Sequence, residues 1–154
     1  MSDLIFMQRA IELSQSAVQN GNEPFGAVLV KDNKIVFENE NQIYTQNDPT
    51  FHAEFGLIRR FVKETGITDL SDYTLYSSCE PCCMCCGAMV WTKLGRLVYA
   101  ASDIDLCSLL GVQGAECVKL VFDASGAKTA VSSGIMRDEA FKVLSDYFKT
   151  HKKG

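Results

Sequence analysis

The chain has 154 residues, of which 47% are apolar and 22% are charged, and its formal net charge is -4. This length suits a single domain (1–154) with a buried core and is too short for two domains. No apolar stretch approaches the roughly 20 residues of a membrane span and no secretory signal pattern opens the chain, so we expect a cytoplasmic protein without membrane contact. The sequence pI is about 5.1 and no long run of Lys or Arg occurs beyond the Lys152-Lys153 pair, which makes nucleic acid an unexpected partner.

The spacing of apolar residues predicts helices and strands that alternate along the chain. Residues 77–79 are predicted as a loop, and residues 103–116 as a loop or short helix. The last helix should turn Tyr147 toward the core. The predicted elements are a helix in the first twenty residues, strands at 26–30 and 35–37, a helix from 52 to about 64, a strand at 73–76, a helix at 82–91, strands at 96–101 and 117–122, and a helix at 137–150. This order predicts an α/β fold, a three-layer α/β/α sandwich around a central mixed sheet of about five strands.

The most informative feature is His52-Ala53-Glu54, followed about thirty residues later by a cysteine cluster that contains Cys82 and Cys85. Three protein ligands, here His52, Cys82 and Cys85, leave zinc a fourth position for a water whose pKa falls to roughly 7. Glu54 is placed to reach that water without competing for the metal. The combination predicts a zinc-dependent nucleobase deaminase, in which Glu54 carries a proton from water to the ring nitrogen and then to the leaving amine.

Five of the seven cysteines crowd into one octapeptide, which fits metal binding in a reducing compartment better than a disulfide framework. We favour Cys82 and Cys85 as ligands, because they stand at i and i+3 on one helical face, directly after a proline, where the helix dipole favours thiolates. Cys83 and Cys86 point about 100° away and are expected to pack as small apolar side chains. Two alternatives stay open: no metal, or a four-ligand structural site that adds Cys79 or Cys83. A structural site would have no need of the neighbouring carboxylate.

Four segments resemble one known family over residues 1 to about 102. They are Pro24-Phe25-Gly26-Ala27-Val28, Asn47-Asp48-Pro49-Thr50, His52-Ala53-Glu54 and Cys79-Glu80-Pro81-Cys82-Cys83-Met84-Cys85-Cys86-Gly87-Ala88. They look like the cytidine deaminase superfamily, in the branch that contains bacterial guanine deaminases, fungal cytosine deaminases and tRNA adenosine deaminases. The resemblance implies a Zn²⁺ cofactor and a homodimer assembled across the helices that bear the zinc site.

The same resemblance implies residues that bind the substrate. Asn41 would hydrogen-bond the base, Phe25 and Trp91 would line the pocket, and His52 would stack against the ring. Phe25, the 47–50 segment and Trp91 look most like guanine deaminases. Plain alternatives stay open, with Phe25 and Trp91 as core residues and Asn41 as a turn former.

The resemblance to guanine deaminases weakens after Ser102. Guanine deaminases carry an acidic residue in a Gly-Phe-Asp-Asp segment that recognises the purine edge. Residues 111–116 of this chain read Gly-Val-Gln-Gly-Ala-Glu, and neither Gln113 nor Glu116 matches that position. Residues 134–148 instead resemble the terminal helix of tRNA adenosine deaminases.

Three functions follow from these observations. The leading expectation is a zinc-dependent hydrolytic deaminase of a free nucleobase or related heterocycle, with guanine as the best candidate. The second is a tRNA adenosine deaminase, which would need phosphate contacts and a flipped base. The third is a zinc-stabilised binding module without turnover, which would have no use for Glu54.

Overall fold

The computed structural model of the protein describes residues 2–151, and the Lys152-Lys153 pair lies outside them. None of the described helices is long and apolar enough to cross a membrane. The elements in chain order are α1 (Ser2–Gln19), β1 (Gly26–Lys31), β2 (Lys34–Glu40), α2 (Ala53–Thr65), β3 (Thr74–Cys79), α3 (Cys83–Trp91), β4 (Arg96–Ala101), α4 (Asp103–Leu110), α5 (Cys117–Ser125), β5 (Ala130–Ser133) and α6 (Arg137–Phe148).

The five strands form one mixed sheet in the order β2-β1-β3-β4-β5. Strand β1 runs antiparallel to β2 and β3, whereas β3, β4 and β5 run parallel. The β1–β2 hairpin turns at Asp32 and Asn33, which have φ angles of 51° and 61°. Two successive residues with positive φ give the hairpin turn whose twist matches that of the paired strands.

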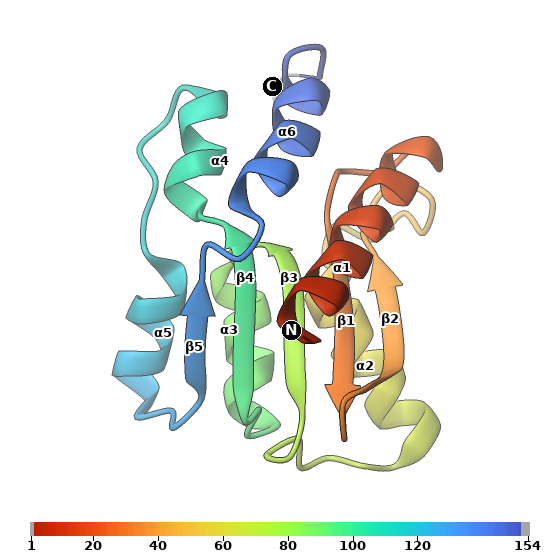
Figure 1. The fold of residues 1–154 in the computed structure, drawn as a ribbon, viewed down its shortest axis with the longest axis vertical. Coiled ribbons are helices and arrows are strands. Elements are labelled where there is room, and N and C mark those ends of the chain that lie inside the picture. The colour runs from red at the N-terminus through yellow and green to blue at the C-terminus, as the bar shows by residue number, and fades with distance from the viewer. Residues whose placement is uncertain (1, 152–154) are drawn as a thin grey trace.

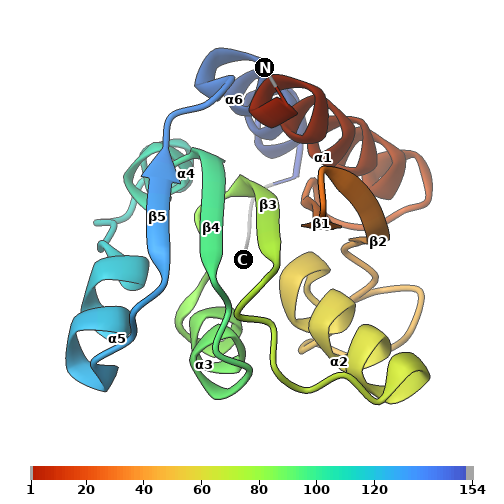
Figure 2. The ribbon, with the colours of Figure 1, turned by 60° about the horizontal axis from the view of Figure 1, so that its bottom comes forward.

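Helices cover both faces of the sheet (Figure 1). Figure 2 shows α1 and α6 on one face and α2, α3 and α5 on the other. Each face has its own apolar core, with Met7 and Leu144 fully buried on the first and Leu57 and Met89 on the second. Helix α4 packs against α6 and so belongs to the first layer. The structure confirms the predicted three-layer α/β/α sandwich with a five-stranded mixed sheet.

Gly26 allows α1 to cross the first strand closely. A Cβ atom at this position would lie 2.3 Å from the carbonyl oxygen of Ala10 and 2.6 Å from the backbone nitrogen of Ser14, so no larger residue fits. Residues 20–25, which join α1 to β1, therefore stay at the edge of the sheet where β1 begins. Because β1 is antiparallel to its neighbours, this is also the edge where β2, β3 and β4 end.

The prediction of a strand at 117–122 is wrong, because these residues begin α5. Val118 and Phe122 are buried on one side while Leu120 is 59% exposed, which is the spacing of a helix rather than the alternation of a strand. The fifth strand is β5. It is short, mostly exposed and lacks an apolar pattern, so nothing in its sequence indicates it.

The prediction of a loop at 77–79 is also wrong, because β3 continues through these residues. Ser77 pairs with Tyr99 of β4, and its hydroxyl donates to the carbonyl of Cys79 at 2.7 Å. The hydroxyl oxygen of Ser78 accepts from the backbone N–H of Gly26 at 3.1 Å. These bonds satisfy polar side chains inside a buried strand, which a polar sequence alone does not reveal.

Candidate metal centre and active site

Two helix N-termini lie at the edge of the sheet where β3 ends. His52 is the N-cap of α2 and Cys82 is the N-cap of α3, both with extended backbone at ψ angles of 158° and 173°. Cys85 follows one turn into α3 and is fully buried. The two helices pack against each other, so their first turns face the same point.

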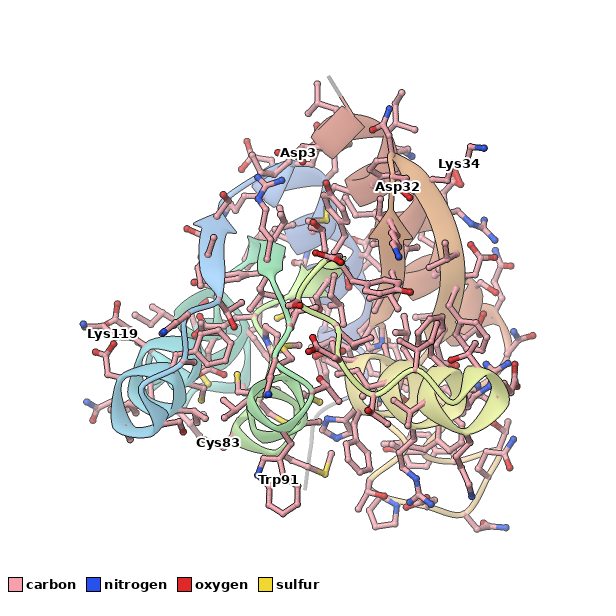
Figure 3. All side chains as sticks on the ribbon, turned by 90° about the horizontal axis from the view of Figure 1, so that it is seen from below. Asp3, Asp32, Lys34, Cys83, Trp91 and Lys119 are labelled. Carbon is pink, nitrogen blue, oxygen red and sulfur yellow. The ribbon has the colours of Figure 1, made fainter. Side chains whose placement is uncertain are left out.

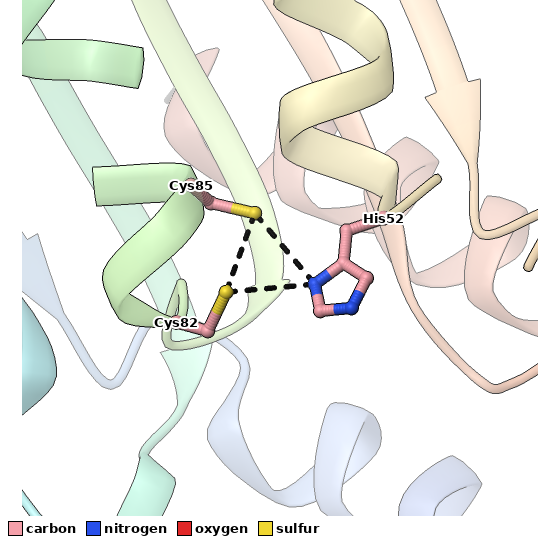
Figure 4. Close-up of side chains that lie close together, drawn as sticks. All are labelled: His52, Cys82 and Cys85. Carbon is pink, nitrogen blue, oxygen red and sulfur yellow. Dashed lines mark hydrogen bonds between the residues drawn. The ribbon is translucent and has the colours of Figure 1, made fainter. Parts of the chain in front are cut away.

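The side chains of His52, Cys82 and Cys85 point toward one another (Figure 4). The Sγ atoms of Cys82 and Cys85 lie 3.5 Å and 3.8 Å from Nδ1 of His52, and the two sulfurs are 3.7 Å apart. A tetrahedral zinc with Zn–S near 2.3 Å and Zn–N near 2.0–2.1 Å requires S···S of about 3.8 Å and S···N of about 3.5 Å. The donor atoms already stand at the spacing that zinc requires.

Among the described residues, the set of mutually close metal-binding atoms contains these three side chains and no fourth. Cys79 is buried in β3 and Cys83 is exposed on α3, and neither belongs to the set. The geometry therefore does not offer the four-ligand structural alternative. A zinc ion held by three protein ligands keeps an open coordination position.

Before any metal binds, Cys82 is favoured as a thiolate and Cys85 as a thiol. Hydrogen bonding from Cys85, and then from His52, lowers the pKa of Cys82 to about 4 against the opposing effect of burial. The contact with Cys82, together with burial, raises the pKa of Cys85 well above its ordinary value. Zinc binding would remove the second proton, because a coordinating thiol is deprotonated.

Glu54 is the second residue of α2 and is only 5% exposed. Burial, and then the negative charge of Cys82, raises the pKa of Glu54 to about 7. Its carboxylate does not belong to the ligand set. A buried carboxyl group that is free of the metal is suited to hold and pass on a proton.

The structure brings Phe25 and Asn41 to the edge of the sheet that carries the metal centre. Phe25 is half-buried and packs against Phe148 of α6, with ring centroids 6.5 Å apart. Asn41 is buried, and its Oδ1 accepts from the backbone N–H groups of Glu23 and Ile43.

Trp91 lies away from the metal centre. It ends α3 and is 89% exposed, and Figure 3 shows it projecting outward from that helix. The rise of an α-helix places it about 13 Å along the axis from Cys82. It borders an apolar cavity of about 390 Å³ between α2 and α3.

A cavity of about 730 Å³ opens beside His52. Its lining comes from the end of α1, the segment before β1, the 43–49 loop and the end of α6. The lining residues are Val18, Gly21, Asn22, Glu23, Ile43, Tyr44, Pro49, His52, Tyr147 and His151. No lysine or arginine occurs in this lining among residues 2–151.

Sequence reasoning missed Glu23, Tyr147 and His151 as residues of this cavity. Tyr147 is half-buried and packs against the core of the first face, as predicted, and its ring stacks on His151 at 4.2 Å between centroids. The one signal in the sequence was a carboxylate directly before the Pro-Phe-Gly segment. Gln113 and Glu116 are exposed between α4 and α5 and do not line the cavity.

The family model described as "Cytidine and deoxycytidylate deaminase zinc-binding region" matches residues 1–101, which include the three donor side chains and Glu54. The chain belongs to this deaminase family. Its members are hydrolytic enzymes with a zinc-binding region, so the metal centre of this deaminase is a zinc site.

Two relatives match this deaminase to different extents. A guanine deaminase from Bacillus subtilis is 45% identical over 106 residues, which are 68% of each chain. A tRNA-specific adenosine deaminase from Buchnera aphidicola is 34% identical over 150 residues, which are 97% of this chain and 96% of the relative. A solved tRNA:A34 deaminase superimposes with a TM-score of 0.77 at 30% identity, covering 90% of this chain and 97% of its own. The names of these relatives therefore point to different substrates.

Proposed function

We propose that this deaminase acts on a free nucleobase, with guanine as the best candidate, and releases ammonia. The observation that carries the proposal is the cavity beside His52. Its lining combines the aromatic rings of Tyr44 and Tyr147 with a buried carboxylate, and it lacks lysine and arginine among the described residues. Such a cavity suits a flat uncharged ring, whereas binding of RNA depends on cations that neutralise phosphates.

The proposed chemistry replaces an exocyclic amine by a carbonyl oxygen. His52, Cys82 and Cys85 would hold zinc, which supplies a water of lowered pKa in its open position. Glu54 takes a proton from the attacking water, delivers it to the adjacent ring nitrogen, and then protonates the amine that leaves as ammonia. Water is the second substrate, and one carboxylate serves all three proton transfers.

Phe25 and Asn41 are proposed to contact the base, and their place at the same edge of the sheet supports this. Trp91 is remote from the metal centre within one chain, so any contact with the base is expected from a second copy. We propose a homodimer for that reason. The apolar cavity between α2 and α3, with Trp91 exposed at its border, supports pairing through this face.

The second candidate is an adenosine deaminase acting on a tRNA loop. It is favoured by relatives of that name that match the whole chain, including α6. The net charge of -4 and the cavity lining count against it. All seven cysteines lie in the described part of the chain and none of them forms a disulfide, which supports a reducing compartment such as the cytoplasm.

Ammonia release from the zinc-loaded protein tests the proposal. The panel contains guanine, cytosine, adenine, their nucleosides and an anticodon stem-loop, each at about 50 and 200 mM salt. We expect ammonia from guanine with little dependence on salt, because capture of an uncharged base releases no counterions. Salt-sensitive conversion of the stem-loop, with no ammonia from any free base, would reject the proposal in favour of the tRNA reaction.

A further inference from the structure

Glu80 is a buried acidic residue close to the metal centre that takes no part in the proposed proton transfers. It follows β3 directly and stands two residues before Cys82. Its side chain belongs to a residue that is only 8% exposed. A carboxylate is seldom buried to this extent unless hydrogen bonds compensate for the loss of water, so the partners of Glu80 indicate what it does.

Both carboxylate oxygens of Glu80 accept hydrogen bonds from the N-termini of helices. Oε1 accepts from the backbone N–H of Asp103, the first residue of α4, at 3.0 Å. Oε2 accepts from the backbone N–H of Val118, the second residue of α5, at 3.2 Å. The first N–H groups of a helix have no partner within it, and the helix dipole favours a negative charge beside them. One side chain therefore serves two helices.

The two helices differ in their own capping. Helix α4 has a capping box, in which Ser102 and Asp105 exchange hydrogen bonds. The N-cap residue of α5, Glu116, makes no side-chain cap hydrogen bond. Glu80 lies 38 positions before Val118 in the sequence and supplies the acceptor that α5 lacks locally. The contact ties the start of α5 to the segment that leads into α3.

The backbone around Glu80 is fixed as well. The N–H of Glu80 donates to the carbonyl of Ala101 at 2.7 Å, at the end of the paired part of β3 and β4. Pro81 has a fixed φ and restricts the backbone of the residue before it. The carbonyl of Pro81 accepts from the thiol of Cys86 at 3.5 Å. Cys82 therefore follows a segment that is held by β4, by α3 and, through Glu80, by α4 and α5.

We infer that Glu80 is a positioning residue for the metal centre, which holds Cys82 at the spacing that zinc requires before the metal binds. The inference rests on the ligand set of the proposed function. Glu80 does not belong to that set, so it acts through the backbone that connects it to Cys82. A ligand that is already in place loses little conformational freedom when the metal binds, and its affinity is higher for that reason.

The zinc affinity of the folded protein tests this role. We would measure the Kd for zinc by competition with a chromophoric chelator, and the absorption spectrum of the Co²⁺-substituted protein. The variants are Glu80→Gln, Glu116→Gln and Cys82→Ala. Glutamine has the size of glutamate but one acceptor oxygen, so its amide nitrogen would face a backbone N–H at one of the two helices. Glu116→Gln removes an exposed carboxylate from the start of α5 and is the matched control.

Glu80→Gln should raise the Kd for zinc about 10–100-fold, the range typical when a residue that orients metal ligands is lost. The thiolate-to-metal charge-transfer bands of its Co²⁺ form should change, because the sulfur of Cys82 is no longer held in one place. Glu116→Gln should match the wild type in both measurements. Cys82→Ala should lose tight binding.

The outcomes separate this role from a purely structural one and from an error in the ligand set. A Glu80→Gln variant whose Kd and Co²⁺ spectrum match the wild type overturns the inference, and a lowered urea midpoint would then show that Glu80 only stabilises the fold. Tight zinc binding by Cys82→Ala rejects the ligand set itself.

If Glu80→Gln fails to fold, hydrogen exchange of the wild type decides. The amides of Asp103 and Val118 should be protected in the metal-free and the zinc-loaded protein alike. Free exchange in the metal-free protein, with protection only after zinc binds, would make the contacts of Glu80 a result of zinc binding and overturn the inference.

Discussion

Replacement of Glu54 by glutamine tests the proposed proton carrier independently of the zinc ligands. The side chain keeps its shape, and the three proposed ligands are untouched, so zinc content should stay at about one per chain. The zinc-loaded variant should lose about 10²–10⁴-fold in kcat, the contribution typical of a positioned general acid–base group.

The structure also sets the expected effect on stability. In the metal-free protein the pKa of Glu54 rises from its ordinary 4.5 to about 7 in the folded state. Below pH 4.5 the carboxyl is protonated in folded and unfolded chains alike, so the variant should match the wild type. Above pH 7 the folded wild type buries a charge that the unfolded chain exposes to water, a penalty of about 3 kcal/mol at most. Metal-free Glu54→Gln should therefore be the more stable protein at pH 8.

Urea unfolding of the metal-free proteins at about pH 3.5 and pH 8, with metal analysis and ammonia release after zinc loading, checks both parts. Glu64→Gln, at the exposed end of the same helix, is the control. A zinc-replete Glu54→Gln variant with more than about a tenth of wild-type activity would refute the role of the carboxylate. A variant less stable than wild type at pH 8 would show that the carboxylate supports the fold instead.

Three further changes test the ligand set, the fold and the assembly. Cys85→Ala should lose zinc by metal analysis while Cys83→Ala keeps it, and equal loss from both would show that the ligand set is wrong. Hydrogen bonds from Arg96 hold the pKa of Asp3 at about 2, so its stabilisation is present above pH 3.8 and lost as pH falls through 2. Asp3→Asn should lower the free energy of unfolding by about 1–2 kcal/mol at pH 7 in urea, a value discounted for side chains about one third exposed. Trp91→Glu should convert a dimer into a monomer in light scattering at micromolar concentration, and a monomeric, fully active wild type would contradict the proposed dimer.

The sequence predicted those parts of the fold whose signals are local. The first helix has its apolar spacing, the hairpin has its polar turn, and the two helices of the metal centre have a proline or polar segment before them. The wrong predictions concern segments that are stabilised by residues distant in the sequence. Ser77 stays in a buried strand because hydrogen bonds satisfy its hydroxyl, and β5 exists because β4 offers it a parallel edge.

The metal centre could be predicted because its residues lie close together in the sequence. The cavity could not be predicted because its residues lie far apart in the sequence. Each half of the centre is a short motif, with Glu54 two residues from His52 and Cys85 three from Cys82, so sequence spacing fixes most of the geometry. The cavity is assembled from segments far apart in the chain. Glu23 and Tyr147 are 124 positions apart in the numbering, and the packing of α6 against α1 brings them into the lining of one cavity.

This division fits the comparisons, in which deaminases named for different substrates match this chain. The match to the Bacillus subtilis guanine deaminase covers two thirds of the chain, and the family region, residues 1–101, holds every residue that we propose to bind zinc or move the proton. The remaining third supplies α6, whose end places Tyr147 and His151 in the lining of the cavity beside His52. A change of sequence in that third can reshape the cavity without disturbing His52, Cys82 or Cys85. For the substrate site that we propose, the packing of the last helix therefore determines which rings fit beside His52, while the residues proposed to bind zinc stay unchanged.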